Sequence, residues 1–170
     1  MNKVDLPPFQ TLLDAHALDV YRLLVATVGR ADADDCYQET WVAALRHYPR
    51  LRDDSNLRSW ILTIAHRKAL DHFRARRRQA VPVAEPPETA AESTATPAPA
   101  TGGGAPTVGF DDELWGVVRG LPAKQRTAIA LRFVADADYA QISSVMGTSE
   151  EAARRNVHEG LKRLRTEYTP

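Results

Sequence analysis

The sequence is poor in the residues that cross-link small proteins or bind metals. Among 170 residues there is one cysteine, Cys36, so no disulfide can form within the chain, and secreted folds that depend on disulfides are excluded. The five histidines and Cys36 show neither a CxxC nor an HxxxH pair, the spacings typical of zinc sites. We therefore expect no metal site and no cofactor.

Long apolar runs are missing too. No stretch approaches the roughly 20 apolar residues that a membrane-spanning helix needs. The first residues, Met1 to Pro8, are polar and end in proline, without the apolar region of a signal peptide. These absences predict a cytoplasmic protein with no membrane insertion.

Motifs for catalysis are not found. The glycine run Gly102–Gly104 lies in a low-complexity segment and not between a strand and a helix, where a phosphate-binding loop would stand. Cys36 falls among the core positions of an expected helix, which favours a buried structural thiol over a reactive one. With no catalytic residue indicated, we do not expect an enzyme.

A net charge is also absent, because 22 basic and 22 acidic residues cancel. The average hides a partition along the chain. Residues 1–78 and 114–170 each carry a net charge of +3, whereas residues 79–113 contain six acids and no lysine or arginine. Two basic segments joined by an acidic one are compatible with nucleic-acid binding, which the total charge would not suggest.

The acidic segment predicts a linker. Residues 79–109 consist mainly of Ala, Pro, Thr, Glu and Gly and contain no aromatic residue. Such a segment cannot bury enough apolar surface to offset its ordering entropy, so we expect it to be flexible. It divides the chain into an N-terminal domain, residues 1–78, and a C-terminal domain, residues 110–170.

Both domains are expected to be helical, because apolar residues recur at helical spacing and no alternating strand pattern occurs. In the N-terminal domain we expect a first helix from about Phe9, a second capped by Asp32 and ended by Pro49, and a third capped by Ser55 or Asn56. The expected apolar stripe of the second helix consists of Tyr37, Trp41, Ala44, Leu45 and Tyr48. The fold class is all-α, with two small helical domains.

A helix-turn-helix is the clearest motif of the C-terminal domain. After helices at 113–119 and from Pro122 to about Phe133, we expect a helix over 139–146, a turn at Gly147-Thr148, and a helix capped by Ser149 that runs to about Glu167. Arginines on the outward face of such a second helix can pair with guanine in the major groove. The outward residues are expected to be Arg154, Arg155, His158 and Lys162.

A second basic surface is expected on the third helix. Between His66 and Arg78 there are six lysines or arginines and one acid, Asp71. Arg67, Asp71, Arg74 and Arg78 fall on one helix face, which suits a track for phosphates. Tyr48 and Trp60 flank the loop before this helix, and aromatic rings beside a basic face are typical of single-strand binding. Core packing is the alternative for Trp60.

These motifs together resemble a known family. The run from Asp34 to Trp41, the run from Leu57 to Arg74, and Leu121-Pro122-Ala123-Lys124-Gln125-Arg126 before the helix-turn-helix are similar to regions 2 and 4 of the bacterial extracytoplasmic-function (ECF) sigma factors, of the sigma-70 family. The resemblance covers essentially the whole chain, with both domains in order. It implies that residues 1–78 bind core polymerase and melt the -10 element, and that residues 110–170 recognise the -35 element.

The resemblance also implies roles for single residues. Asp35, Gln38 and Glu39 would dock on the β′ clamp helices of core RNA polymerase. The loop from Arg52, with Asp54, Ser55 and Asn56, would capture a flipped -10 base, and His66, Arg67, Asp71 and Arg74 would hold the nontemplate strand. The residues implied for -35 recognition are Ser149, Arg154, Arg155, His158 and Lys162. Residues 121–133 would rest on the β flap, the linker would lie in the RNA channel, and an anti-sigma factor is an expected partner.

The departures from the family pattern include two residues of the second helix of the helix-turn-helix. Asn156 and Glu159 stand where basic residues are common, so the -35 contact is expected to be shifted or weaker. Two other functions remain open at this stage. A stand-alone helix-turn-helix regulator would bind a palindromic duplex without polymerase. A protein that only sequesters polymerase would not need the arginines of the second helix.

Overall fold

The computed structural model describes residues 6–52, 56–80 and 112–168, and all its regular elements are helical. No strand occurs within these ranges, which confirms the all-α class. The linker expected at 79–109, apart from its first two residues, lies outside the described residues, as do Asp54 and Ser55. The elements are α1 (Phe9–Val28), α2 (Arg30–His47), the 3-10 turn η1 (Tyr48–Arg50), α3 (Leu57–Gln79), α4 (Asp112–Gly120), α5 (Ala123–Phe133), α6 (Tyr139–Met146) and α7 (Glu150–Glu167).

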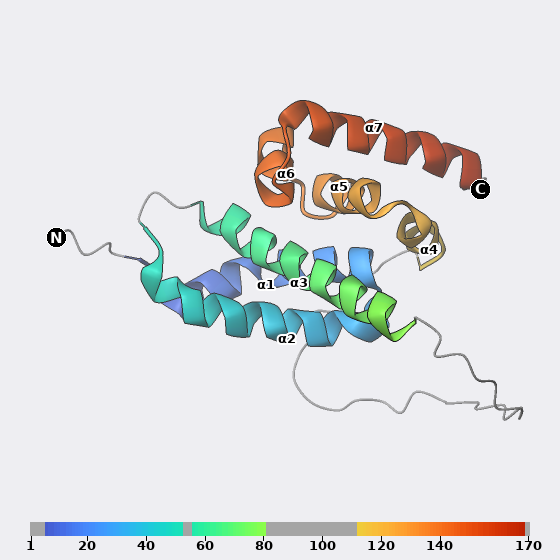
Figure 1. The fold of residues 1–170 in the computed structure, drawn as a ribbon. Coiled ribbons are helices and arrows are strands. Elements are labelled where there is room, and N and C mark those ends of the chain that lie inside the picture. The colour runs from blue at the N-terminus through green and yellow to red at the C-terminus, as the bar shows by residue number, and fades with distance from the viewer. Residues whose placement is uncertain (1–5, 53–55, 81–111, 169–170) are drawn as a thin grey trace, which may run out of the picture.

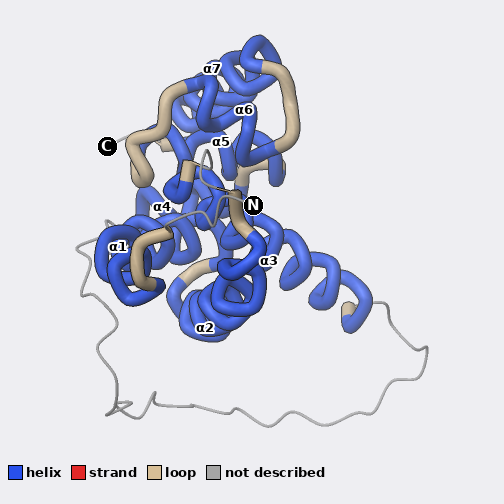
Figure 2. Tube along the Cα trace, turned by 90° about the vertical axis from the view of Figure 1, so that its left-hand side faces the viewer, coloured by secondary structure: helices blue, strands red, loops and turns tan. Residues whose placement is uncertain are grey.

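Helices α1 to α3 form the N-terminal bundle. The three helices lie side by side, with the C-terminal helices α4 to α7 stacked on one side of them (Figures 1 and 2). Fully buried Val20 and Leu24 of α1 pack in the bundle core with Ile61 of α3. At roughly 1.5–3 kcal/mol for each large aliphatic side chain removed from water, this core stabilises the bundle.

The second helix begins earlier than the sequence predicts. Gly29, with φ +90°, ends α1 and directly precedes α2, so Asp32 lies within the first turn and is not the cap. Asp32 instead contacts α3, where its carboxylate accepts from Arg76 at 3.0 Å. The prediction that Leu45 belongs to the buried stripe is also wrong, since 57% of the residue is exposed. It lies at the edge of the stripe centred on Trp41 and Tyr48, which are buried.

The third helix is capped by Asn56, one of the two candidates. Its side chain accepts a hydrogen bond from the backbone N–H of Ser59 at 3.1 Å. This bond satisfies one of the free N–H groups at the start of α3, which is the ordinary function of an N-cap. The α-helical part of α2 ends at His47, just before Pro49, as predicted.

The C-terminal helices follow their local signals closely. Pro122 precedes α5 as its N-cap, one position outside the place predicted for it. Asp138 and Gln141 form a reciprocal capping box at the start of α6, with the Gln141 N–H donating to Asp138 at 2.7 Å. Helix α6 spans Tyr139–Met146 and α7 starts after Ser149, both as predicted.

Helices α5 and α7 approach each other closely at Gly160. A β-carbon on Gly160 would lie 2.9 Å from Cγ1 of Ile129, nearer than real contacts allow. Because Cγ1 is close to the backbone of α5, the clash could not be relieved by moving a side-chain tip. Gly160 therefore sets how α7 sits on α5, which positions the second helix of the helix-turn-helix.

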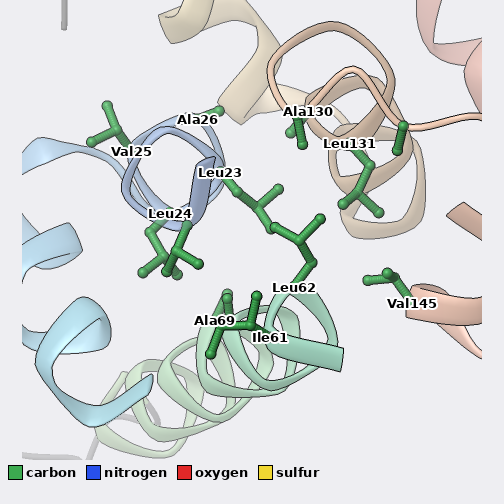
Figure 3. Packing of buried hydrophobic residues seen from close by; sticks show 14 of the residues in the cluster. Leu23, Leu24, Val25, Ala26, Ile61, Leu62, Ala69, Ala130, Leu131 and Val145 are labelled. Carbon is green, nitrogen blue, oxygen red and sulfur yellow. The ribbon is translucent and has the colours of Figure 1, made fainter. Parts of the chain in front are cut away.

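An apolar interface joins the two sets of helices. Figure 3 shows Leu23 of α1 and Leu62 of α3 extending toward Leu131 of α5 and Val145 of α6. All four side chains are buried, with at most 3% of any of them exposed. The N-terminal bundle and the C-terminal helices thus share one core in this structure.

Candidate nucleic-acid interface

The helix-turn-helix is built by α6, a tight turn and α7. Gly147 has φ +63° and ψ +40°, the left-handed conformation that a glycine adopts without strain. Ser149 then caps α7 by accepting from the Ala152 N–H at 3.1 Å. Ala153 and Val157 are buried against the rest of the domain. The predicted motif is confirmed as a fold element, and its second helix presents the opposite face outward.

The outward face of α7 carries every residue that the sequence placed there. The exposed residues are Ser149, Arg154, Arg155, His158 and Lys162. Arg154 is also held by a contact that the sequence does not indicate, since its guanidinium lies 5.0 Å from the ring centroid of Tyr139. Arg132 lies over the same ring at 5.5 Å. Tyr139 thus orients one arginine of the exposed face through a cation–π contact.

The two residues of α7 that depart from the family pattern are less exposed than their neighbours. Asn156 and Glu159 are both half-buried, whereas Arg155 and His158 are exposed. The Glu159 carboxylate therefore lies toward the side of the exposed face and not at its centre. The exposed face is nevertheless not purely basic, because Glu150 and Glu151 in the first turn of α7 are exposed as well.

A second basic surface runs along α3, on the face defined here as the α3 track: Arg67, Asp71, Arg74 and Arg78. All four residues are exposed, as predicted. Arg74 Nη1 lies 3.4 Å from Asp71 Oδ1, an exposed pair that contributes little to stability. The remaining positive charge is free to attract phosphates.

His66 is less exposed than Arg67, Asp71 and Arg74, the other residues expected to hold the nontemplate strand. It is half-buried, and burial followed by the neighbouring Arg67 charge lowers the pKa of its imidazole below the ordinary value. At neutral pH the ring is therefore neutral. It can donate or accept a hydrogen bond, but it adds no positive charge to the α3 track.

Aromatic residues flank the start of α3. The Tyr48 ring is buried, lies 6.1 Å from the Trp60 ring and donates its hydroxyl to the Pro7 carbonyl at 2.5 Å. Tyr48 is therefore a core residue. Trp60 is half-buried and lines a groove of about 390 Å³ with Asn56, Arg67 and others. The ring thus packs on the core with one side and borders the groove with another.

The opposite face of α3 is occupied by contacts with α2. Arg76 and His72 both approach Asp32 Oδ2, at 3.0 and 3.2 Å. Arg76 follows Arg67 by nine residues, about two and a half turns, so it points away from the α3 track. His72 and Arg76 thus join α3 to α2 through Asp32. They are therefore less available to a ligand than the arginines of the α3 track.

Helix α2 presents a mixed acidic and apolar surface, defined here as the α2 patch: Asp35, Gln38, Glu39, Val42 and Leu45. All five are exposed, including 49% of Val42 and 57% of Leu45. Glu39 lies 3.6 Å from Lys68 of α3. The sequence indicated the three polar residues of this surface but not Val42, and it placed Leu45 in the core stripe. Exposed aliphatic side chains beside carboxylates are typical of a protein-binding surface.

The C-terminal helices carry an apolar groove of their own. Its volume is about 370 Å³, and it lies between α4, α5 and α7. Trp115, Phe133 and Tyr168 are among the residues that line it, and 57% of Phe133 is exposed. A large ring on the surface next to an apolar groove again indicates a place for a partner protein.

The described residues offer little for catalysis or metal binding. Cys36 is 3% exposed, and burial, with nearby carboxylates, raises the pKa of its thiol to about 11, so it is an unreactive core residue as predicted. No group of three His, Cys, Asp or Glu residues that could hold a metal occurs in the described part of the chain. Among the same residues, no helix is long and apolar enough to cross a membrane.

Two family models match separate parts of the chain. Residues 12–79 match sigma-70 region 2, and residues 111–164 match sigma-70 region 4. The first match contains α2 and α3, and the second contains the helix-turn-helix. Both basic surfaces described above therefore lie within regions that these models recognise.

Similar proteins and structures cover nearly the whole chain. RNA polymerase sigma factor SigV of Bacillus subtilis (strain 168) is 26% identical over 94% of this chain and 90% of its own length. ECF RNA polymerase sigma factor SigC of Mycobacterium tuberculosis (strain CDC 1551 / Oshkosh) is 28% identical over 95% and 83%. Among solved structures, sigma factor RpoE in complex with anti-sigma factor NepR from Bartonella quintana has a TM-score of 0.68, 22% identity and coverage of 92% and 93%. CnrH in complex with the cytosolic domain of CnrY has a TM-score of 0.66, 18% identity and coverage of 93% and 85%.

Proposed function

Because the chain belongs to the extracytoplasmic-function group of the sigma-70 family and directs core RNA polymerase to promoters, we propose that α3 and α7 divide promoter recognition between them. Residues 1–78 serve as region 2, residues 110–170 as region 4, and residues 79–109 as a linker in the RNA channel. The observation that supports this division is the pair of separate exposed basic faces, one on each helix.

The -10 element is held by the N-terminal bundle in this proposal. Arg67 and Arg74 of the α3 track bind phosphates of the nontemplate strand, while Asp71 and neutral His66 supply hydrogen bonds. Unpaired bases stack beside Trp60, and a base flipped from the duplex enters the loop that ends at Asn56. Flipping costs a few kcal/mol, which stacking and hydrogen bonds in the loop must recover. Asp54 and Ser55 of that loop complete the proposed set.

The -35 element is read by α7. Arg154 and Arg155 meet base edges in the major groove, and Lys162 meets a phosphate. His158 lies one turn further along the same exposed face as Arg154 and Arg155, and Ser149 lies at the start of the helix, where backbone N–H groups favour an anion. Tyr139 keeps Arg154 directed outward before DNA arrives.

The α2 patch and the apolar groove between α4, α5 and α7 make the contacts with polymerase in this proposal. The α2 patch docks on the β′ clamp helices, with Asp35, Gln38 and Glu39 supplying polar contacts around Val42 and Leu45. The groove at Phe133 receives the β flap. An anti-sigma factor would regulate the chain by competing for these surfaces, and the protein would act in the cytoplasm as a transcription initiation factor that needs no catalytic residue or cofactor.

Run-off transcription with purified core polymerase on a genomic DNA library tests the function directly. The chain should produce transcripts from a defined set of start sites, each preceded by shared -10 and -35 sequences, and core polymerase alone should not. A stand-alone regulator predicts another result: specific binding of the free protein to a palindromic duplex and no start site that depends on the chain. That result would overturn the proposal.

The α2 patch yields a milder prediction. Glu39→Gln should weaken binding to core polymerase by about fivefold, as expected when one exposed charge at an interface is removed. The change keeps the side-chain volume and leaves Lys68 without its partner at 3.6 Å. Titration of labelled protein with core polymerase measures the affinity. Asp14→Asn on α1 is the matched control, since Asp14 is exposed and accepts a hydrogen bond from neighbouring Gln10 of the same helix; equal effects of both variants would count against the docking surface.

A further inference from the structure

A basic cavity lies between the C-terminal half of α3 and the start of α5. Its volume is about 520 Å³, which falls within the range of small-molecule sites. Arginines dominate its lining, and none of the described residues that line it is acidic. The arginines are Arg74, Arg76 and Arg77 of α3 and Arg126 of α5. Four cations around one small volume repel one another, so an anion between them would be stabilised.

Two of the four arginines have no acidic partner. The Arg74 and Arg76 guanidinium groups each lie near an aspartate, at 3.4 and 3.0 Å. Within the described ranges, no carboxylate lies within ion-pair distance of Arg77 or Arg126. The positive charge that the protein leaves uncompensated in this cavity therefore belongs mainly to Arg77 and Arg126.

The Arg126 guanidinium is held in place by two contacts and still has donors to offer. It lies 4.4 Å from the ring centroid of Phe73, and its Nη1 donates to the Arg119 carbonyl at 2.8 Å. Its Nε is buried and has no hydrogen-bond partner in the structure. Most buried donors in native proteins have a partner, so this one indicates a place that a ligand can complete. Burial also lowers the pKa of Arg126, as expected for a cation in partly dry surroundings.

The two walls of the cavity are fixed relative to each other by contacts outside it. Arg58, at the start of α3, donates through Nη2 to the backbone carbonyl of Ala135, and through Nε to Asp19 of α1 at 3.1 Å. Leu62 of α3 and Leu131 of α5 are buried in the shared core beside this contact (Figure 3). A cavity with preformed walls requires little ordering when a ligand binds.

We propose that this cavity is a binding site for a nucleoside polyphosphate. Guanidinium groups bind phosphate oxygens through paired hydrogen bonds, so Arg77 and Arg126 hold the phosphates, with Arg74 beside them. Leu70 and Phe73 are both half-buried and line the same cavity, which gives the base an apolar wall. Phosphates alone would leave this wall unused, and a nucleoside alone would leave the arginines unpaired.

The cavity is separate from the surface proposed for single-stranded DNA. Arg67 and Arg78 of the α3 track line other grooves, and the track shares only Arg74 with the cavity. A strand that followed the track would therefore pass beside the cavity and not through it. Competition between strand and nucleotide for Arg74 rests on the proposed function, whereas binding of the nucleotide does not.

Fluorescence titration of the full chain with ATP that carries a methylanthraniloyl group on its ribose measures binding. Wild-type protein should bind this probe saturably. Arg77→Gln should bind it about tenfold more weakly, as expected when a charge-assisted hydrogen bond to phosphate is lost. Arg78→Gln is the matched control, because Arg78 is also exposed but lines a groove with Cys36 and His72 instead. Its affinity should stay within about twofold of the wild type, since a charge outside the cavity is screened by solvent and salt.

Competition with unlabelled compounds tests the class of ligand. ATP should displace the probe at least about tenfold more effectively than tripolyphosphate or adenosine, because each of these lacks one half of the recognised molecule. Displacement by either compound as effective as that by ATP would overturn the assignment to a nucleoside polyphosphate. Equal losses of affinity in Arg77→Gln and Arg78→Gln would overturn the site, because total charge would then determine binding. A wild-type protein without saturable binding would overturn it as well.

A fluorescein-labelled random-sequence single strand distinguishes nucleic acid from a small ligand. Its affinity should fall far less in Arg77→Gln than that of the ATP probe. A loss as large as that of the probe would assign the cavity to the strand and overturn the proposal. Neither titration contains polymerase or promoter DNA. A failed transcription assay would therefore overturn the proposed function and leave the nucleotide site standing, and a lack of ATP binding would do the reverse.

Discussion

Replacing Arg154 and Arg155 together by alanine should lower initiation at a promoter with an intact -35 element by at least about thirtyfold. An arginine that pairs with a base edge contributes about 1–3 kcal/mol, and the two are neighbours on the exposed face of α7. The fold should survive, because neither side chain belongs to the buried face formed by Ala153 and Val157. Tyr139 would lose its contact with Arg154 but keep the one with Arg132.

The measurement compares run-off transcription from two templates that differ only in the -35 sequence. Wild-type protein should discriminate strongly between them, and the double variant should not. Arg163→Ala serves as the matched control, since Arg163 is exposed on α7 but about two and a half turns from Arg154. If the double variant keeps its dependence on the -35 sequence, α7 does not read bases through these arginines.

Arg67→Ala combined with Arg74→Ala should have the second large effect, on promoter opening. Two phosphate contacts would be lost from the α3 track, so the holoenzyme should bind a single-stranded -10 oligonucleotide roughly tenfold more weakly, with a slope against log salt shallower by about 1.4. Open-complex formation, followed by 2-aminopurine fluorescence in the -10 element, should slow in parallel, while core binding should stay unchanged.

The same helix supplies the control for this variant. Arg76→Ala removes an arginine from the opposite face, where it pairs with Asp32 at 3.0 Å. An exposed pair of this kind contributes up to about 1 kcal/mol to stability, so any effect should appear in thermal unfolding and not in the salt slope. Equal loss of single-strand binding in Arg76→Ala and in the double variant would show that total charge matters and the track does not.

Local signals predicted the helix-turn-helix almost completely. Gly147 provides the left-handed turn and Ser149 the cap, and both act within a few residues of their own position. The bounds of α6 and the exposed residues of α7 followed from these signals and from helical periodicity. The roles of those residues in DNA binding remain predictions.

Contacts between distant residues could not be predicted in this way. Asp32 looked like a cap because its residue type suits one, yet Arg76, 44 positions later, determines its contact. Leu45 followed helical spacing but lies beyond the reach of α1 and α3. Arg58 and Ala135 are 77 positions apart, and no local pattern indicates that they meet. Such contacts depend on how the two halves pack, which periodicity does not describe.

The close approach at Gly160 has a consequence for how promoter preference can change over evolutionary time. With no room for a side chain between α5 and α7, the angle and depth of α7 are fixed, and a larger residue at 160 would disturb the core before it altered DNA contacts. The exposed positions at 154, 155 and 158 carry no such constraint. Under the proposed -35 role of α7, descendants of this chain can therefore acquire new -35 preferences by exchanging surface residues one at a time, on a scaffold whose geometry is inherited unchanged.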